Sequence, residues 1–210
     1  MRIFNFSSGI YGLVLERFSE IIHIMNYKIG IIAGSLRKAS FSKKIAKAVA
    51  AFQPEGFLFE IIAIDGLPVY NQDFDDFNEA PESYKKIRQT LKEMDGFIFI
   101  TPEHNRSIPA VLKNVMDIGS RPAEDSVWND KPAAIFSSSP GNISAFGANH
   151  HLRQCFVYLN LPTMQQPEVY ITKIDEWFDD NGNIKEDENK KFLKSSVEAY
   201  TEWFKRLQKK

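Results

Sequence analysis

Five apolar segments along the chain have the composition of buried β-strands. Each is short and rich in β-branched or aromatic residues, which is typical of strands covered on both faces of a parallel sheet. The fifth is interrupted, because a polar stretch separates "PTM" from "EVYI". The segments are residues 27–33, 57–64, 96–101, 132–137 and 162–171. The pattern therefore predicts a five-stranded sheet.

Between these segments, apolar residues recur every three or four positions, the spacing of an amphipathic helix. This spacing predicts helices over residues 41–52, 84–94, 108–118, 149–160 and 193–207. Pro81 can open the second of them at its first helical position. The regular alternation of strand and helix favours one α/β domain, residues 27–210, with helices on both faces of a parallel sheet.

Residues 1–26 precede this alternation and form an N-terminal extension. Its apolar run "GIYGLVL" is too short to span a bilayer, and no small-residue cleavage site marks a secretory signal. Two interpretations remain. The first is a short amphipathic helix with an apolar stripe made by Val14, Phe18, Ile21 and Met25. The second, which we favour, is that translation begins at Met25.

Three loops carry the residues that could bind a ligand: "GSLRKASFS", "TPEHNRSIPA" and "SSSPGNISAFG". They follow the first, third and fourth strands. In a three-layer, doubly wound sheet of flavodoxin-like strand order 2-1-3-4-5, these strands are neighbours, so the loops meet at the point where open α/β sheets bind ligands.

The first loop has the features of a phosphate site. Ser40 or Ser42 can cap the helix that follows, and Arg37 supplies a guanidinium. A helix N-terminus of this kind binds anions. The alternative is a capped helix that happens to carry a surface arginine. Both G-x-x-x-x-G-K-[ST] and G-x-G-x-x-G are missing from the sequence. A terminal monophosphate remains, and FMN is its most common owner on this architecture.

The motifs together resemble one family. "GSLRKASFSKKIA", "LPVYNQD", "TPEHNRSIPAVLKN", "SSPG", "HLRQ" and "LPTMQQPEVYI" occur in the order found in the NADPH-dependent FMN reductases of flavodoxin-like fold, which include bacterial chromate and quinone reductases. The resemblance extends from about Tyr27 to Ile171. The sequence departs from the family at two positions: His104 stands where tyrosine is usual, and Ile118 where tryptophan is common. Both departures are expected near the flavin or the subunit contact.

The resemblance implies a set of cofactor-binding residues. The first loop would hold the FMN phosphate and ribityl chain through Ser35, Leu36, Arg37, Ser40, Phe41 and Ser42. The isoalloxazine ring would lie against Pro102, Glu103, His104 and Asn105, with Ser139 and Gly141 closing the other side. His104 could donate a proton near neutral pH, but the simpler interpretation is a ring that partly covers the flavin.

The activity implied is that of an NAD(P)H-dependent FMN reductase that passes electrons to quinones or to a nonphysiological oxidant such as chromate. NADPH or NADH would dock over the flavin, leave, and be replaced by the acceptor in the same pocket. No side chain is then required as a catalytic acid or base, because the flavin is the reactive centre.

Two alternatives belong to other functional classes. A single-electron carrier of the flavodoxin type is usually strongly acidic, whereas this chain has a net charge of -1 and carries Arg37 in its phosphate loop. A non-catalytic flavin-binding module on the same scaffold is not excluded by the fold; consumption of NAD(P)H would exclude it.

Composition narrows the setting. With 43% hydrophobic and 25% charged residues the chain is an ordinary globular protein, and its charge gives no general attraction to nucleic acid or membrane. A single cysteine suits the cytoplasm. His151 and Cys155 have a spacing that can ligate a metal, but no further ligands cluster with them, so we expect no metal site and a Cys155 that faces the core. The resemblance implies a homodimer or homotetramer with the flavin near the subunit interface.

Overall fold

The computed structural model describes residues 27–208. Their strands form one five-stranded sheet in the order β2-β1-β3-β4-β5. All four pairings are parallel. The predicted strand order is therefore confirmed. The strands are β1 (Tyr27–Ala33), β2 (Phe57–Ile62), β3 (Gly96–Thr101), β4 (Ala133–Ser138) and β5 (Val169–Ile171).

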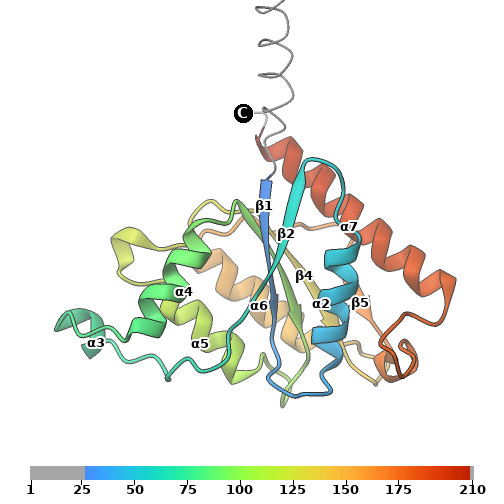
Figure 1. Ribbon diagram of the computed structural model, residues 1–210, viewed down its shortest axis with the longest axis horizontal. Coiled ribbons are helices and arrows are strands. Elements are labelled where there is room, and N and C mark those ends of the chain that lie inside the picture. Colours follow the sequence, from blue (N-terminus) through green and yellow to red (C-terminus); the bar gives the residue numbers. More distant parts are fainter. Residues whose placement is uncertain (1–26, 209–210) are drawn as a thin grey trace, which may run out of the picture.

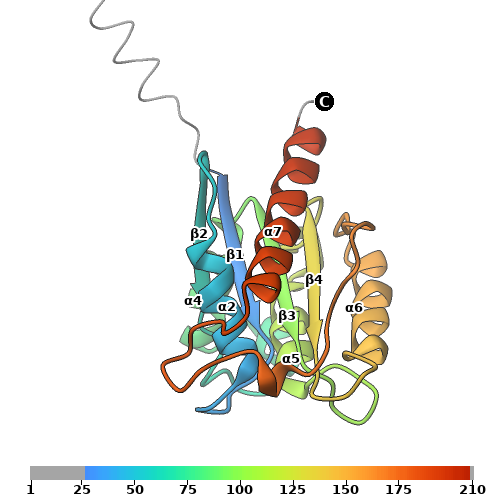
Figure 2. The same cartoon turned by 90° about the vertical axis from the view of Figure 1, so that its right-hand side faces the viewer.

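Helices cover both faces of this sheet. In Figure 1, α4 (Glu82–Lys92) and α5 (Ala110–Gly119) lie on one side, and α2 (Phe41–Ala51) and α7 (Asp187–Gln208) on the other. Figure 2 looks onto the face of the sheet that α2 and α7 cover, with the strands side by side behind them, and shows α6 (Phe146–Tyr158) at the β4 end of the sheet. The predicted three-layer arrangement is confirmed.

Helix boundaries differ from the prediction by a few residues, most of all at α7, which begins at Asp187 and not at the predicted Leu193. Helix α6 begins three residues earlier than the predicted Asn149, so Phe146 and Gly147 belong to the helix and not to the preceding loop. Pro81 is the N-cap of α4 with an extended backbone, and Glu82 is the first helical residue. Proline suits either position, because its fixed φ matches the helix and it lacks the N–H that would go unpaired.

Three short helical segments were not predicted: α3 (Asp73–Asp76) and the 3-10 turns η1 (Ala123–Asp125) and η2 (Ile174–Glu176). Each has only three or four residues and no side-chain N-cap hydrogen bond. Such segments are too short to show a helical repeat in sequence.

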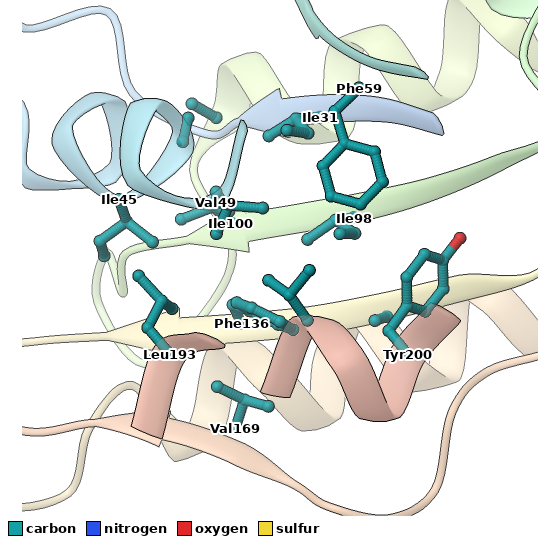
Figure 3. Close-up of a cluster of buried hydrophobic side chains, with 14 of the residues drawn as sticks. Ile31, Ile45, Val49, Phe59, Ile98, Ile100, Phe136, Val169, Leu193 and Tyr200 are labelled. Carbon is teal, nitrogen blue, oxygen red and sulfur yellow. The ribbon is translucent and has the colours of Figure 1, made fainter. Parts of the chain in front are cut away.

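The core has two halves, one on each face of the sheet. Between the sheet and α2 and α7, side chains such as Ile31, Val49, Phe136 and Leu193 are buried together (Figure 3). The other half packs beneath α4, α5 and α6 around the fully buried Trp128. At about 1.5–3 kcal/mol for each large apolar side chain buried, these two clusters are the main stabilising contribution.

The interrupted fifth strand is confirmed. Thr163 forms an isolated parallel bridge with Ala133, and β5 then continues the pairing beside Phe136 to Ser138. The two interpretations of residues 1–26, including a start at Met25, concern residues outside the described range. Within residues 27–208, none of the helices combines the length and apolarity needed to cross a membrane.

Candidate active site

The loops that follow β1, β3 and β4 meet at the C-terminal edge of the sheet, the lower edge in Figure 1, and enclose a pocket of about 180 Å³. Nine of the twelve predicted cofactor residues line it. Leu36, Asn105 and Gly141 do not. Three residues that the sequence reasoning missed also line it: Ser138, Pro140 and Ile174.

The first loop leads into a capped helix. Ser40 is the N-cap of α2, and its Oγ accepts a hydrogen bond of 3.2 Å from the backbone N–H of Lys43. This decides between the two serines considered as caps. Helix geometry leaves the N–H groups of Phe41 and Ser42 without an intrahelical acceptor, and the first turn of α2 has no acidic residue. With Arg37 on the rim, this end of the pocket suits an anion.

The second loop is shaped by a tight hairpin. His104 and Ser107 exchange two backbone hydrogen bonds of 2.9 Å, and the two residues between them, Asn105 and Arg106, have φ values of 50° and 67°. These are the features of a two-residue turn with both central residues left-handed. Asn105 is placed at the tip of the turn, which explains why it does not line the pocket as predicted.

Glu103 connects this loop to α6. Its side chain is only 13% exposed, and Oε2 accepts a hydrogen bond of 3.2 Å from the backbone N–H of Ala148 in the first turn of α6. The other oxygen, Oε1, lies 3.3 Å from Nη1 of Arg106. Glu103 thus joins the hairpin to the first turn of α6.

Gly147 permits the close approach of the two elements. A Cβ at this position would lie 2.8 Å from the carbonyl oxygen of Arg106 and 3.0 Å from Oε2 of Glu103. A second contact reinforces the junction, because Oγ of Ser107 lies 2.9 Å from Nδ1 of His151 on α6. The β3–α5 loop and α6 are therefore fixed to each other.

The third loop is held by backbone bonds to the segment after β5. The N–H of Ser139 donates to the carbonyl of Ile171, and the N–H of Ile174 donates to the carbonyl of Ser139. Gly141 contributes only its carbonyl, which accepts from Oγ of Ser139 at 3.0 Å. Ile174, in η2, completes the wall. Its sequence signal was its position just after the fifth strand, at the same edge of the sheet as the three loops.

Helix α6, which contains the motif "HLRQ", is hydrogen-bonded to the sheet near the pocket. Asn149 is fully buried on α6 and donates from Nδ2 to Oγ of Ser137 on β4. Arg153 in turn donates from Nε to Oδ1 of Asn149 at 3.0 Å and from Nη1 to the carbonyl of Met164 at 3.3 Å. These bonds fix α6 to the end of the sheet that carries the pocket.

A larger hollow of about 690 Å³ lies between α5 and α6, on the other side of the 104–107 hairpin. It is open, and its lining mixes apolar and charged side chains: Ile108, Met116 and Tyr158 beside Lys113 and Asp117. We call it the α5–α6 groove. The α5–α6 groove is larger than the pocket. The helix N-terminus, the hydroxyl groups and the hairpin nevertheless come together at the smaller pocket.

Cys155 and His151 both line this groove. Cys155 packs against the core as predicted but is only half-buried, and burial raises the pKa of its thiol. A raised pKa disfavours the thiolate that a nucleophile would need. Among residues 27–208, no group of three or more metal-ligating side chains lies together.

The two departures from the family pattern have different locations. His104 is exposed and lines the pocket. Ile118, which was expected near the flavin or a subunit contact, is fully buried within the core beneath α4, α5 and α6. Ile118 is the second-last residue of α5 and faces inward, so its replacement of tryptophan is a matter of packing.

Comparison with known proteins identifies the family. Residues 27–176 match the family described as "NADPH-dependent FMN reductase". The chain belongs to the NADPH-dependent FMN reductase family. The match extends five residues beyond the predicted end at Ile171 and includes Ile174.

Relatives with known names align with this chain over most of their own length. A quinone reductase of Pseudomonas putida is 42% identical over 179 residues, which is 85% of this chain and 95% of the relative. A 2-hydroxy-1,4-benzoquinone reductase of Burkholderia sp. is also 42% identical, over 85% of this chain and 97% of its own. Among solved structures, FerB of Paracoccus denitrificans, a flavoenzyme NAD(P)H:(acceptor) oxidoreductase, superimposes with a TM-score of 0.79 and 32% identity, over 86% of this chain and 98% of its own.

These findings confirm the family, the fold and the enzyme class predicted from the sequence. The chain is an oxidoreductase of the FMN-dependent, NAD(P)H-using type.

Proposed function

We propose that the chain holds FMN in the pocket at the N-terminus of α2 and uses it to pass electrons from NAD(P)H to quinones. One observation carries this proposal: nine of the twelve residues expected to contact FMN, from loops far apart in sequence, line a single pocket. The quinone reductases of Pseudomonas putida and Burkholderia, each 42% identical to this chain, support the choice of acceptor.

The chemistry of the pocket fits the phosphate of FMN. Ser40 and Ser42 are almost fully buried at the start of α2, where unpaired N–H groups favour an anion. We assign the phosphate to these N–H groups with Ser35, Ser40, Ser42 and the guanidinium of Arg37. Leu36 and Phe41 would flank the chain that joins phosphate to ring.

The ring would lie between the second and third loops. Pro102, Glu103 and His104 form one wall, and Ser139 the other. Asn105 and Gly141 would act from outside the lining, Asn105 at the hairpin tip and Gly141 through the carbonyl that fixes Ser139.

When bound, FMN supplies the capacity to accept two electrons from a reduced nicotinamide and to release them to a quinone. The residues around the pocket bind and orient, and we assign no catalytic acid or base among them. His104 and Arg37 lie at the exposed rim, so a second substrate can reach the pocket from solvent. One opening would then serve both the nicotinamide and the quinone in turn.

Further parts of the proposal concern setting and assembly. Metal oxyanions such as chromate are proposed as additional acceptors, and the cytoplasm as the location. Residues 1–26 are proposed as an extension to a reductase domain of residues 27–210.

We propose a homodimer or homotetramer and assign the contact to the α5–α6 groove. The exposed ring of Tyr158, beside the ion pair that Lys113 and Asp117 form within the chain, would suit a second copy of the same face.

The test is steady-state kinetics of benzoquinone reduction by the FMN-loaded protein. A shared pocket predicts ping-pong kinetics, with parallel double-reciprocal lines when NADPH and quinone are varied. Intersecting lines would show that both substrates bind at once and would exclude the shared pocket. Absence of quinone-dependent NADPH oxidation would contradict the proposed activity itself.

A further inference from the structure

Helix α6 begins without a cap of its own. Its N-cap residue is Ala145, which has a left-handed φ of 61° and no side chain able to accept a hydrogen bond. The first N–H groups of any α-helix lack intrahelical partners and carry partial positive charge. In the described chain, the carboxylate of Glu103 meets this need from a different loop, at 3.2 Å from the N–H of Ala148.

Glu103 is also one of the residues that line the pocket assigned to FMN. It is 13% exposed, while Arg106, which lies 3.3 Å from it, is 73% exposed. Solvent therefore screens the arginine more strongly than the carboxylate. Glu103 thus places a negative charge beside the pocket, and among residues 27–208 the only formal positive charge within 4 Å of its carboxylate, that of Arg106, is on the solvent side.

The junction around this carboxylate is closely fitted. Gly147 has no room for a Cβ, since that atom would lie 2.8 Å from the Arg106 carbonyl and 3.0 Å from Oε2 of Glu103. Arg106 also holds a left-handed φ of 67° in a two-residue turn where glycine is the usual choice. A backbone held in a sparsely populated region at a pocket points to a functional constraint.

We infer that Glu103 is a positioning residue with an electrostatic effect on the flavin: it replaces the missing cap of α6 and lowers the reduction potential of the bound cofactor. Reduction adds negative charge to the flavin, and a nearby carboxylate disfavours that charge. A lower potential favours onward transfer of the electrons to the acceptor. This inference rests on the proposed function.

The test compares variants that change charge and variants that change shape. Glu103→Gln keeps an oxygen to accept from Ala148 but removes the negative charge. It should raise the affinity for reduced over oxidised FMN about tenfold, equivalent to a rise of about 30 mV in the two-electron potential. Arg106→Gln leaves the carboxylate without its partner. It should shift the potential the other way, by about 15 mV for a threefold change in the affinity ratio.

Two further variants are the controls. Gly147→Ala preserves every charge but forces the hairpin away from α6, so it should weaken binding of oxidised FMN about tenfold with a smaller change of potential. Glu202→Gln removes an exposed carboxylate from α7 and should change neither quantity. The affinity for oxidised FMN is measured by fluorescence quenching, and the potential by anaerobic titration against dyes of known potential.

An unchanged potential in Glu103→Gln, or shifts of the same sign in Glu103→Gln and Arg106→Gln, would overturn the inference and leave Glu103 a purely structural cap. If Glu103→Gln fails to retain FMN, the potential of Arg106→Gln decides alone: a fall supports the inference and no change overturns it. Failure of the unaltered protein to bind FMN would instead overturn the proposed function.

Discussion

Hydroxyl groups and one guanidinium lie at the end of the pocket that is proposed to hold the FMN phosphate. Ser40 and Ser42 are almost fully buried, and Arg37 carries the only guanidinium among the residues that line the pocket. Small hydroxyl side chains leave the helix N–H groups accessible, and the guanidinium adds a charge with geometry suited to phosphate. We therefore expect the affinity for FMN to depend on a few side chains that contribute little to the core.

Arg37→Ala should weaken FMN binding by a factor of about ten to a hundred, since a hydrogen bond to a charged group contributes about 1.5–3 kcal/mol. The free energy of unfolding of the apoprotein should be unchanged, because Arg37 is exposed. Fluorescence titration with FMN gives the affinity. Lys38→Ala is the matched control: it removes a neighbouring exposed charge that does not line the pocket. Equal FMN affinity in the two variants would refute the role of Arg37.

At the scale of elements, stability depends on contacts between segments distant in sequence. Helix α3 has only four residues and is attached to α4 through Asp75 and Arg88. The two N–O distances between these side chains are 2.7 and 2.8 Å, and the side chains are 15% and 12% exposed. Nε of Arg88 also donates to the carbonyl of Ile118. The pair thus joins α3, α4 and the end of α5.

Asp75→Asn should destabilise the protein by about 3 kcal/mol at pH 7, because it leaves a largely buried guanidinium without its counter-charge. The hydrogen bonds from Arg88 lower the pKa of Asp75 below its ordinary value of 3.8. Its contribution to stability is therefore present above that value and is lost as the pH falls through the lowered pKa. Urea unfolding should show a large difference between wild type and variant at pH 7 that shrinks in strong acid. A difference that does not depend on pH would contradict this account.

Most elements could be predicted from the sequence, because their signals are local. Strands β3 and β4 are buried throughout, as their continuous apolar runs indicated. The sequence also narrowed the N-cap of α2 to two candidates, Ser40 and Ser42. The contact of Glu103 with Ala148 could not be predicted, since the two residues are 45 positions apart and meet only in the folded sheet. Ile174 was missed although it follows the fifth strand at the same edge of the sheet, because an apolar residue in a three-residue 3-10 turn carries no pattern that marks it as part of a site.

At the scale of the whole molecule, the pocket and the α5–α6 groove lie on the two sides of one hairpin. His104 lines the pocket, Ser107 lines the groove, and backbone hydrogen bonds pair the two residues. A second copy of the chain seated in the groove would therefore contact the loop that forms a wall of the flavin pocket. Assembly and cofactor binding are expected to be coupled through this hairpin.

Tyr158→Glu should convert the proposed oligomer to monomers, because it places a charge on an 85% exposed ring at the groove. Sedimentation velocity at micromolar concentration measures the mass directly. Phe77→Glu is the matched control, since Phe77 is an exposed aromatic residue in the segment after β2 and does not line the groove. An unaltered protein that sediments as a monomer, or a Tyr158→Glu variant of unchanged mass, would refute the assignment of the groove.

The central claim is that this chain binds FMN and reduces it with a nicotinamide nucleotide. Its most direct test is the visible absorbance spectrum of the purified protein after addition of FMN and removal of the excess, followed by titration with NADPH without air. The account predicts one FMN per chain, and bleaching of the flavin absorbance in a single two-electron step at one equivalent of NADPH. A protein that retains no flavin, or a bound flavin that NADPH leaves oxidised, would contradict it.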